Sequence, residues 1–580
     1  MASLHKKIVT LFEETADMLE VNNENPFKVR AFRNAARAVE GVGKKIEDMA
    51  QQGKLEEING VGKSIAEHIQ DIIHHGTFPE YQKLHKQIPS EVLEMLSIPG
   101  VGAKKARTLW KELNIKSIKA LEHACHKHLV SEFSGFGKKS EEKILAGIEG
   151  LKKFSDLFRF DEANAEAAKL LSYLKKSSHL IQLELGGSLR RHKEICKDID
   201  LIASSNKPNK LMDYFVAYPE VASVINKGTT KSSVKLQSGI NVDLRVVSDE
   251  DFPFALHHFT GSKEHNVALR TLAKAKGFKL NEYGLFKGKK EIFVSCKNET
   301  DLFKHFGMDF IPPELRENQG ELEAAQDHAL PDLVTLSDLK GVLHCHSTYS
   351  DGKNSMEEMA LAAKDEGFSY IGITDHSHSA AYAGGMKLAD IKRQHKEIDA
   401  LNKKLKEIQI LKGIEVDILE DGSLDYKNEV LALFDFVIAS VHSRFKMGEK
   451  KMTERICTAL ASPYVDILAH PTGRLLLERE AYEVNLAQVI ECAAKNGVAI
   501  EMNANPRRLD IDWRYGKLLK EKKVKSCISP DAHSTDQLDF CNYGIGIARK
   551  GWLEAGDILN TLSADALLKH FSQMRKKRRC

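Results

Sequence analysis

The sequence lacks the features that mark membrane and secreted proteins. No stretch approaches the ~20 consecutive apolar residues that a membrane-spanning helix needs. Residues 1–20 are interrupted early by acidic side chains and lack the apolar core of a secretion signal. The nine cysteines form no Cys-x-x-Cys pair, so neither a disulfide framework nor a thiolate zinc site is indicated. We therefore expect no membrane partner and a reducing, cytoplasmic location.

An excess of one charge is also missing. The 580 residues include 85 Lys and Arg against 82 Asp and Glu, which leaves a net charge of +3. The whole-chain charge therefore gives no reason to propose a nucleic-acid partner. At ~100–200 residues per domain, this length predicts three to five domains. Histidine, with 24 residues, is the unusual count.

The period of the apolar residues changes along the chain. Residues 1–150 show helical spacing broken by short glycine-containing turns. Short runs rich in Ile, Leu and Val then predict strands at 181–185, 198–203 and 240–247. The charged, Gln- and Ala-rich segment 317–335 is typical of a linker. Beyond it, seven strand-like runs alternate with helical patterns and predict a parallel (βα)7 barrel; the runs are 341–347, 370–376, 409–418, 434–442, 465–470, 498–504 and 526–533.

Three segments of the helical part repeat one pattern: an apolar residue, a Gly-x-Gly turn and a helix start that bears Lys or Ser. Glycine lets the backbone approach another chain closely, and the unpaired N–H groups of a helix start can hold a phosphate. One copy would equally fit a plain turn between two helices, but three copies favour phosphate binding. They resemble helix-hairpin-helix motifs, which bind the DNA backbone; the expected contacts are Gly60, Gly62, Lys63, Gly100, Gly102, Lys104, Gly135, Gly137 and Lys138.

Three aspartates on two predicted strands indicate a metal-dependent reaction centre. Asp198 and Asp200 lie two residues apart on one strand and therefore share a face, and Asp243 lies on another strand. Carboxylates that meet on one face repel each other unless cations lie between them, and Mg²⁺ prefers carboxylate and phosphate oxygens. A lone Asp-x-Asp is weak evidence, since polar residues commonly alternate on half-exposed strands. Together with Gly187 and Ser188, however, the three aspartates resemble a nucleotidyltransferase palm.

The residues that follow narrow the resemblance. Segments 259–266 (FTGSKEHN) and 277–284 (GFKLNEYG) are similar to the nucleotide-binding part of family X DNA polymerases, and the resemblance covers residues 1–315. It implies that Asp198, Asp200 and Asp243 are the catalytic residues and hold two Mg²⁺ or Mn²⁺ ions. It also implies nucleotide contacts by Gly187, Ser188, Arg191, Phe259, Gly261, Asn266 and Arg270.

Two positions depart from the family pattern. His258 stands where animal relatives carry Tyr, so exclusion of the ribose 2′-hydroxyl is in doubt. His68 stands where repair relatives use a lysine that forms a Schiff base with an abasic sugar, and imidazole is a poor Schiff-base former. We therefore expect no 5′-deoxyribose-phosphate lyase activity by that route. Lys28 and Lys63 remain as candidate ligands of a 5′-phosphate in the DNA.

The C-terminal part holds nine histidines, six of which close a predicted strand or lie close to its end. The C-terminal ends of barrel strands converge on one rim, where imidazoles and carboxylates can bind Zn²⁺, Mn²⁺ or Fe²⁺. One such histidine is more often structural, but nine ligand-type side chains at the same end of consecutive strands argue against coincidence. The pattern resembles the PHP (polymerase and histidinol phosphatase) domain, which implies up to three divalent ions, Mn²⁺ and/or Zn²⁺, held by His344, His346, Asp351, His376, Glu415, His442, His470, Asp531 and His533.

Other residues of this part are weaker candidates. Cys345 lies between two of the histidines on a strand and should point away from them. Arg444, Arg474 and His378 are candidates for neutralising a phosphate. The basic tail 575–579 is expected to be a solvated end.

Together the motifs predict a multidomain chain: an α-helical N-terminal helix-hairpin-helix region, an α+β nucleotidyltransferase palm with a thumb, and a C-terminal (βα)7 PHP barrel. The expected boundaries are an 8-kDa-like domain at 1–80, a second helix-hairpin-helix subdomain at 81–150, the palm at 151–250, a subdomain that binds the nascent base pair at 251–316, a linker at 317–335 and the PHP domain at 336–575.

The leading hypothesis is a bacterial-type family X DNA polymerase that fills short gaps in base excision repair. Its PHP domain would act as a 3′→5′ exonuclease, and incision at abasic sites (AP endonuclease activity) stays open. The expected partners are gapped or nicked duplex DNA and dNTPs, and the expected state is a monomer. One alternative is a PHP-type small-molecule phosphatase fused to a DNA-binding module. A non-catalytic scaffold that clamps nicked DNA is another, although the complete set of palm aspartates and barrel ligands argues against it.

Overall fold

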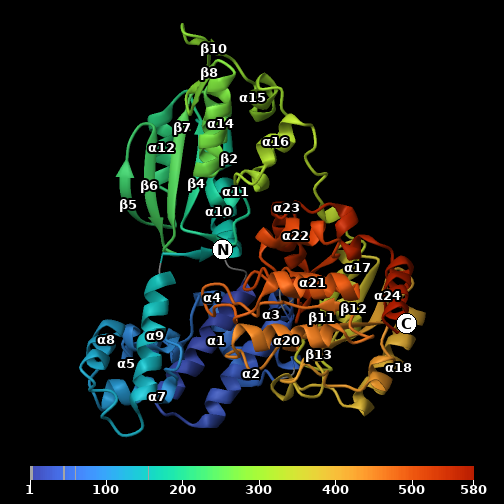
Figure 1. Ribbon diagram of the computed structural model, residues 1–580. Coiled ribbons are helices and arrows are strands. Elements are labelled where there is room, and N and C mark those ends of the chain that lie inside the picture. The colour runs from blue at the N-terminus through green and yellow to red at the C-terminus, as the bar shows by residue number, and fades with distance from the viewer. Residues whose placement is uncertain (1–3, 43–45, 59, 155, 580) are drawn as a thin grey trace. The chain divides into compact units, whose positions relative to one another are not determined.

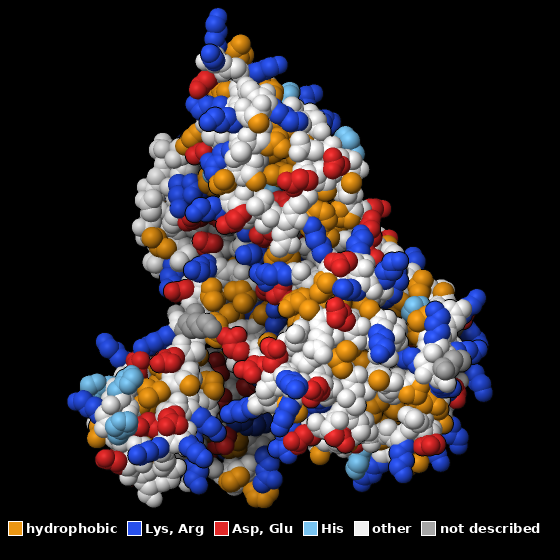
Figure 2. All heavy atoms as spheres, viewed as in Figure 1, with side chains coloured by type: hydrophobic (Ala, Val, Ile, Leu, Met, Phe, Trp, Pro, Cys, Tyr) orange, Lys and Arg blue, Asp and Glu red, His pale blue; other side chains and the backbone are white. Residues whose placement is uncertain are grey.

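The computed structural model describes residues 4–42, 46–58, 60–154 and 156–579. The chain forms two compact units, Met1–Ser155 and Asp156–Cys580. Within the described ranges, no helix is long and apolar enough to cross a membrane. On the face shown in Figure 2, Lys and Arg side chains are interspersed with Asp and Glu, as the small net charge leads one to expect.

The first unit is helical, as its apolar spacing predicts (Figure 1, blue to cyan). Its core includes Phe12, whose ring meets those of Phe32 and Phe78 edge-on at 5.6 and 5.7 Å. The helices are α1 (Leu4–Val21), α2 (Pro26–Val42), α3 (Ile46–Gln51), α4 (Lys63–His75), α5 (Pro79–Gln87), α6 (Ser90–Glu94), α7 (Ala103–Lys111), α8 (Ile118–His126) and α9 (Lys138–Phe154).

The second unit begins with a five-stranded sheet in the order β2-β4-β7-β6-β5. Only β4 and β7 are parallel neighbours; the other pairs are antiparallel. The three strands predicted in this region are confirmed, and the hairpin β5–β6 is an addition to them. The sheet consists of β2 (Gln182–Leu185), β4 (Asp198–Ser204), β5 (Val221–Lys227), β6 (Lys231–Leu236) and β7 (Asn241–Val247); α10 (Phe160–Leu174) and α12 (Pro208–Val216) pack on it, α11 (Gly187–Arg190) follows β2, and β1 (Phe158–Arg159) pairs with β3 (Ile195–Cys196).

A smaller α/β region follows, with the mixture of helices and short strands that the sequence predicts. It contains α13 (Phe252–Thr260), α14 (Lys263–Ala275), β8 (Phe278–Asn281), β9 (Gly284–Lys287), β10 (Ile292–Val294) and α15 (Glu299–His305). The segment expected to be a linker is folded: it includes helix α16 (Glu321–Gln326), and Leu322, Ala325 and Leu333 join the core of this region. The linker prediction rested on the polar composition of this segment and was wrong. Glu321 is buried, and its Oε1 atom lies 2.6 Å from Nδ1 of His265.

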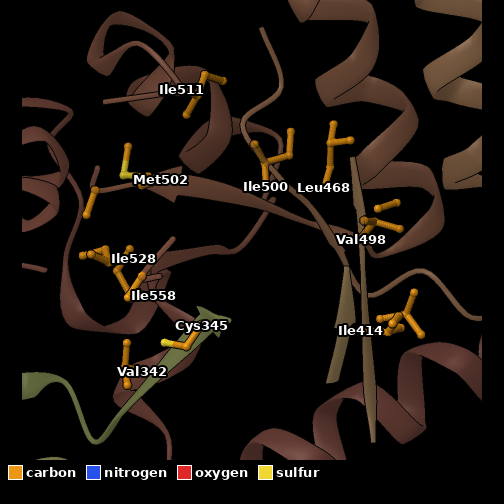
Figure 3. Close-up of a cluster of buried hydrophobic side chains, with 14 of the residues drawn as sticks. Val342, Cys345, Ile414, Leu468, Val498, Ile500, Met502, Ile511, Ile528 and Ile558 are labelled. Atoms are coloured by element: carbon orange, nitrogen blue, oxygen red, sulfur yellow. The ribbon is translucent and has the colours of Figure 1, made fainter. Parts of the chain in front are cut away.

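All seven predicted barrel strands are present, parallel and in sequential order. A bridge from Cys345 to Ala532 brings the last strand back beside the first, so the barrel is nearly closed. Successive side chains of a strand point to opposite faces of the sheet. Val342 and Leu343, which are neighbours on the first barrel strand, therefore belong to different apolar clusters. Figure 3 shows one of these clusters, with Ile414, Ile500 and Ile528. The strands are β11 (Gly341–Cys345), β12 (Tyr370–Ile373), β13 (Gln409–Asp417), β14 (Phe436–Ser440), β15 (Ile467–Leu468), β16 (Ala499–Asn503) and β17 (Ser526–Ser529).

Helices connect the barrel strands: α17 (Met356–Asp365), α18 (Leu388–Lys404), α19 (Asn428–Leu431), α20 (Glu449–Leu460), α21 (Leu486–Asn496) and α22 (Gly516–Glu521), followed by α23 (Cys541–Lys550) and α24 (Ala564–Arg579). The basic tail predicted to be a solvated end belongs to α24. Arg575 and Arg578 pair with Asp466, whose carboxylate is buried. The attraction of a buried carboxylate for two guanidinium groups therefore fixes this end of the chain.

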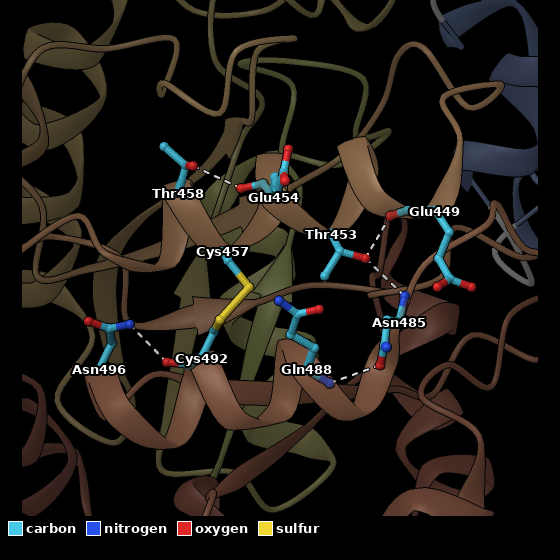
Figure 4. The surroundings of a disulfide bond; sticks show 9 residues. All are labelled: Glu449, Thr453, Glu454, Cys457, Thr458, Asn485, Gln488, Cys492 and Asn496. Atoms are coloured by element: carbon cyan, nitrogen blue, oxygen red, sulfur yellow. Dashed lines mark hydrogen bonds between the residues drawn. A yellow bond between two sulfur atoms is a disulfide. The ribbon is translucent and has the colours of Figure 1, made fainter.

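One disulfide joins Cys457 of α20 to Cys492 of α21 (Figure 4). The sequence gives no signal for it, because 35 residues separate the two cysteines and only the packing of the two helices brings them together. Six further cysteines among the described residues are free and buried, Cys345 among them.

Candidate functional site

The palm strands bring the three predicted catalytic aspartates together. Asp200 of β4 is the direct partner of Asp243 in the parallel pair β4–β7, and Asp198 lies two residues earlier on the same face. Asp243 accepts a hydrogen bond from the Ser233 hydroxyl at 2.5 Å and pairs with Lys231 at 2.6 Å. Two neighbouring strands of one sheet are thus sufficient to form the carboxylate cluster.

The electrostatics of this cluster favour bound cations. Burial, with the charges of Asp198 and Asp243, raises the pKa of Asp200 to about 6. Burial, and then the Asp243 charge, also raises the pKa of Asp198. Carboxylates whose ionised forms are destabilised by burial and by each other gain most from divalent cations, which take hard oxygen ligands. The donor set therefore fits Mg²⁺ or Mn²⁺.

Gly187 lies against this cluster and cannot carry a side chain. Its φ is +61°, and a Cβ atom would overlap Oδ2 of Asp200. The helix α11 therefore begins directly beside the carboxylates, with Ser188 as its second residue. A hydroxyl and a backbone N–H next to the metal-binding face suit the phosphates of a nucleotide.

Four of the residues predicted to contact the incoming nucleotide lie at or near the turn between α13 and α14. The side-chain amide of Asn266 donates to the carbonyls of His258 at 2.7 Å and Gly261 at 3.2 Å. Phe259 lies under Arg245, with the guanidinium 4.0 Å from the ring centroid. Arg270 is exposed one turn further along α14 and donates to the Asn266 carbonyl at 3.1 Å. The turn thus holds four of the seven predicted nucleotide contacts next to one another.

Arg191 has partners that the sequence did not predict. Its guanidinium pairs with Glu317 at 2.9 Å and donates to the Thr260 carbonyl at 2.7 Å. Lys550, from α23 of the barrel part, reaches the same Glu317 at 2.5 Å and the Arg191 carbonyl at 3.1 Å. Burial lowers the pKa of Lys550 to about 8, although Glu317 opposes that shift. A buried lysine thus links the barrel to a predicted nucleotide-binding residue of the palm.

The three Gly-x-Gly turns share one backbone geometry. The first glycines, Gly60, Gly100 and Gly135, have φ of +93°, +94° and +91°, which a side chain disfavours. The second glycines of the first two turns, Gly62 and Gly102, are N-caps of α4 and α7 without a side-chain cap. A Cβ atom at Gly62, Gly102 or Gly137 would meet nothing within 4 Å. No internal packing requires these second glycines, so they leave the helix starts open to an external group.

His68, which the resemblance places where a lyase lysine would stand, lies beside two phenylalanine rings of the first unit. Its ring packs against Phe32 and Phe78, with centroids 5.8 and 4.6 Å away, and burial lowers its pKa. Its Nε2 atom lies 3.7 Å from Glu80, which also pairs with Lys28. The side chain is thus a packed imidazole, and Lys28 is the nearby primary amine.

The barrel rim collects all nine predicted PHP ligands. Their ligand atoms form four overlapping groups that could hold metal ions: His346, Asp351, His376 and His533; His344, Glu415 and His470; His344, His346 and Asp531; and His376, Glu415 and His442. His344, His470 and Asp531 have positive φ values of 58°, 25° and 52°. Such backbone conformations cost energy and concentrate at functional sites.

Glu415 is the centre of the rim cluster. Its carboxylate lies within 3.7 Å of imidazole nitrogens from five of these histidines: His344, His346, His376, His442 and His470. Burial raises the pKa of Glu415, but the imidazoles of His376, His442 and His344 outweigh it and hold the pKa well below its usual range. Several buried atoms here have no hydrogen-bond partner, including Nε2 of His344 and both ring nitrogens of His346. Buried, unpartnered imidazole nitrogens around a carboxylate fit divalent metal ions.

Two carboxylates that orient the histidines were missed in the sequence. Nδ1 of His344 lies 2.5 Å from Glu501 of β16, and Nδ1 of His442 lies 2.6 Å from Asp417 of β13. A metal-binding histidine usually donates its second ring N–H to such a group, which fixes the ring and its tautomer. Asp417 follows Glu415 by two residues on one strand, so the alternation of side chains was an available signal for it. Glu501 had no comparable signal.

None of the three residues predicted to bind a phosphate borders the cavity over the rim. Arg444 pairs with Glu420 at 2.9 Å, Arg474 pairs with Asp512 at 3.1 Å, and His378 is exposed elsewhere. The cavity has a volume of about 770 Å³ and is lined instead by Arg508 and Tyr382, beside the ligands Asp351, His442, Asp531 and His533.

Family models match four parts of the chain. They describe a helix-hairpin-helix domain at residues 4–78, a SAM-like helix-hairpin-helix tandem at 92–149, a DNA polymerase beta thumb at 255–317 and a PHP domain at 343–505. The thumb and PHP matches fall on the α/β region after the palm sheet and on the barrel.

Known proteins match over the same parts. The chain is 41% identical over 563 residues to "DNA polymerase/3′-5′ exonuclease PolX" of Bacillus subtilis, which covers 97% of this chain and 98% of that protein. A probable phosphatase of Thermoanaerobacter is 28% identical over 242 residues, 38% of this chain and 91% of its own length. Human DNA-directed DNA/RNA polymerase mu is 42% identical over 78 residues, 13% of this chain and 16% of its own. Because the first match extends over nearly the whole of both chains, this protein belongs to the bacterial PolX family of family X DNA polymerases, with helix-hairpin-helix, polymerase beta thumb and PHP domains.

Proposed function

We propose that this protein is a DNA-directed DNA polymerase that fills short gaps in base excision repair, and that its PHP domain removes nucleotides from 3′ ends as a 3′→5′ exonuclease. The supporting observation is that one chain carries two separate clusters of metal-ligand side chains, one of carboxylates on the palm and one of imidazoles and carboxylates on the barrel rim. A labelled gapped duplex, incubated with nucleotides and metal ions, tests both activities at once.

In the palm we assign the reaction centre to Asp198, Asp200 and Asp243. Mg²⁺ or Mn²⁺ ions there would neutralise the triphosphate and lower the pKa of the primer 3′-hydroxyl. The chain's own groups would position the nucleotide: the start of α11 lies beside the carboxylates and next to the end of α13, since a Cβ atom at Gly186 would lie 3.5 Å from Cβ of Asp200 and 3.3 Å from the Phe259 carbonyl. We assign nucleotide binding to Gly187, Ser188, Arg191, Phe259, Gly261, Asn266 and Arg270, and Arg191 would exchange Glu317 for a phosphate.

At the rim we assign metal binding to the nine ligands collected by the barrel, with up to three divalent ions, Mn²⁺ and/or Zn²⁺. Such ions would polarise a phosphodiester and neutralise its charge. Glu501 and Asp417 would fix the orientations of the His344 and His442 rings. Trimming and synthesis complement each other, because a mismatched 3′ terminus must be removed before extension. Incision at abasic sites is a second activity that we assign to the same cluster.

We assign binding of gapped or nicked duplex DNA to the three hairpin turns together with Lys28, and dNTPs are the second substrate. Local charge supports this assignment, since Lys63, Lys104 and Lys138 lie at the open helix starts. We retain the boundaries 1–80, 81–150, 151–250, 251–316, 317–335 and 336–575 as the domain assignment, with 317–335 as a folded connection. We also propose that the protein is a monomer and that it is located in the cytoplasm.

Replacing Gly102 by serine is expected to weaken binding to gapped duplex DNA about tenfold without lowering the melting temperature. Serine is a better N-cap than glycine, and its Cβ has space at this position, but the side chain would occupy the phosphate-binding helix start. Binding by fluorescence anisotropy and thermal unfolding are the measurements. Gly448→Ser is the matched control, since Gly448 is also an N-cap with open space around it, on α20 of the barrel. An unchanged affinity of Gly102→Ser would remove the DNA-binding role of this turn.

The polymerase is expected to fill a one-nucleotide gap about tenfold faster when the downstream strand carries a 5′-phosphate. The charge of that phosphate would be met by Lys28 and Lys63. Replacing both lysines by methionine should erase the difference, whereas Lys54→Met, at an exposed position of the same unit, should leave it intact. Equal rates with and without the 5′-phosphate would contradict this assignment.

A further inference from the structure

The cavity over the rim cluster is lined by side chains other than the metal ligands. The cleavage of a phosphodiester by metal ions does not by itself require these side chains. Its wall joins four of the predicted metal ligands to a set of aromatic and basic residues: Tyr382, Phe445, Arg479, Arg507 and Arg508. Its volume, about 770 Å³, lies in the range of pockets that take small ligands, ~300–1,000 Å³. A pocket of this size has room for one or two nucleotides.

Tyr382 is an exposed aromatic residue at the edge of the metal-ligand cluster. It lies on a single turn, Ala381–Ala383, after β12, and 71% of its surface is exposed. Its ring centroid is 6.1 Å from that of His376 and 6.2 Å from that of His442. An aromatic ring held beside buried metal-ligand side chains, with its own surface open to solvent, is a platform on which a flat group can stack.

Arg508 brings a positive charge to the wall of the same cavity. It follows β16 in the loop that also carries Arg507, and only 18% of its side chain is exposed. Its Nε atom lies 3.2 Å from Oδ2 of Asp531. A guanidinium has five N–H donors in a fixed fork, so this one contact does not exhaust its capacity for a phosphate.

The rest of the wall is also suited to a nucleic-acid strand. Arg479 covers the Phe445 ring with its guanidinium 4.5 Å from the centroid, and Phe445 stacks on Tyr482 at 5.9 Å. Arg507 pairs with Glu478 at the rim. Basic groups interleaved with aromatic rings are the combination by which proteins hold single-stranded nucleic acid.

We propose that this pocket binds the unpaired last nucleotide of a DNA 3′ strand, with Tyr382 stacked on its base and Arg508 against the phosphate that is cleaved. The proposal rests on the exonuclease function proposed above and assigns two side chains that would hold the 3′ end in place. In the reaction, water forms a bond to phosphorus and the bond from phosphorus to the 3′ oxygen of the preceding sugar breaks. That oxygen takes the proton, and a nucleoside 5′-monophosphate leaves.

Tyr382 is tested by a cycle that combines a protein change with a substrate change. Wild type, Tyr382→Ala and Tyr382→Phe are assayed on a single-stranded oligonucleotide and on the same strand ending in an abasic sugar. Tyr382→Ala is expected to raise KM for the normal strand about tenfold, the value of one base stack, with a smaller effect on kcat. On the abasic strand it should change KM by no more than about twofold. Tyr382→Phe should behave as wild type, because stacking needs the ring and not the hydroxyl.

Two controls separate stacking from damage to the fold. Thermal unfolding of each variant reports on the fold of the barrel, and extension of a gapped primer confirms that the palm is unaffected. Tyr283→Ala, which removes a tyrosine that is 60% exposed in the region after the palm, should leave 3′ degradation unchanged. An equal loss on the normal and the abasic strand would overturn the base-stacking role.

Arg508 is tested in parallel with Arg508→Met and Arg508→Lys. Loss of a charged hydrogen bond to the phosphate should lower kcat/KM about tenfold or more in Arg508→Met, and lysine should restore part of it. Because Arg508 touches Asp531, Mn²⁺ binding is measured calorimetrically on the same proteins. Loss of cleavage with Mn²⁺ affinity retained supports the phosphate role, and loss of both overturns it. If the wild type degrades no 3′ end at all, the exonuclease function itself fails, which is distinct from failure of the pocket assignment.

Discussion

Replacing Asp243 by asparagine is expected to lower primer extension on gapped duplex DNA about a thousandfold, because a bound metal ion contributes several kcal/mol to such a reaction and ~1.4 kcal/mol is tenfold in rate. Asp243 is the strand partner of Asp200, so the substitution removes one charge from the three-carboxylate cluster. Asparagine keeps the shape of the side chain and can still meet Ser233. Degradation of the 3′ strand should continue at the wild-type rate, since the barrel cluster uses none of these aspartates.

Single-nucleotide incorporation, resolved on a sequencing gel, is the measurement. Asp213→Asn is the matched control: Asp213 lies on α12 of the same palm, its side chain is 63% exposed, and it pairs with the surface residue Lys227 at 2.5 Å. Extension by Asp243→Asn within about tenfold of wild type would place the polymerase reaction elsewhere.

Replacing Glu415 by glutamine is expected to lower 3′→5′ degradation about a thousandfold, again by loss of metal-ion stabilisation worth several kcal/mol. Glu415 lies within 3.7 Å of nitrogens from five histidines. The neutral amide removes the only carboxylate shared by two of the candidate metal groups of the described rim. Gap filling should stay at the wild-type rate, because Glu415 belongs to the barrel and polymerisation is assigned to the palm carboxylates.

Metal binding gives this prediction a second readout. A ligand that binds only the folded state raises the melting temperature, so Mn²⁺ should stabilise the wild type more than Glu415→Gln. Glu491→Gln, at a carboxylate that is 62% exposed on α21, should respond to Mn²⁺ as the wild type does. Degradation that survives Glu415→Gln would point to a different nuclease site or to a contaminant.

Together the two variants also decide between the hypotheses that the sequence left open. A small-molecule phosphatase fused to a DNA-binding module predicts no extension in either the wild type or Glu415→Gln. A non-catalytic scaffold predicts neither extension nor degradation. Loss of one activity in each variant, with the other retained, is the result that the two-enzyme assignment requires.

Much of both sites followed from local sequence. The alternation of side chains along a strand is enough to place Asp198 and Asp200 on one face, and the rule that parallel strands end on one rim is enough to place His344 beside His470. The glycine turns were equally local, since a positive φ at Gly100 follows from the turn itself. These features depend on periods of two to four residues, which a sequence displays directly.

The residues that the sequence missed depend on contacts between distant segments. Glu501 supports His344 across 157 positions, and nothing in its own neighbourhood marks it as a partner. The segment 317–335 looked like a linker because it is polar, yet Glu321 is buried against His265. Composition predicts exposure only where the polar groups lack partners within the fold.

The sequence by itself determined that this chain has three glycine turns, a carboxylate pair on one strand and nine ligand-type residues at strand ends, because local periodicity fixes which side chains share a face. Only the tertiary structure decided which groups complete those sites. Lys550 reaches Glu317 across 233 positions, Cys457 bonds to Cys492 across 35, and Tyr382 and Arg508 meet over one cavity from the ends of different strands. Such pairs are selected by the packing of whole helices and strands, and that packing minimises a free energy to which every part of the unit contributes.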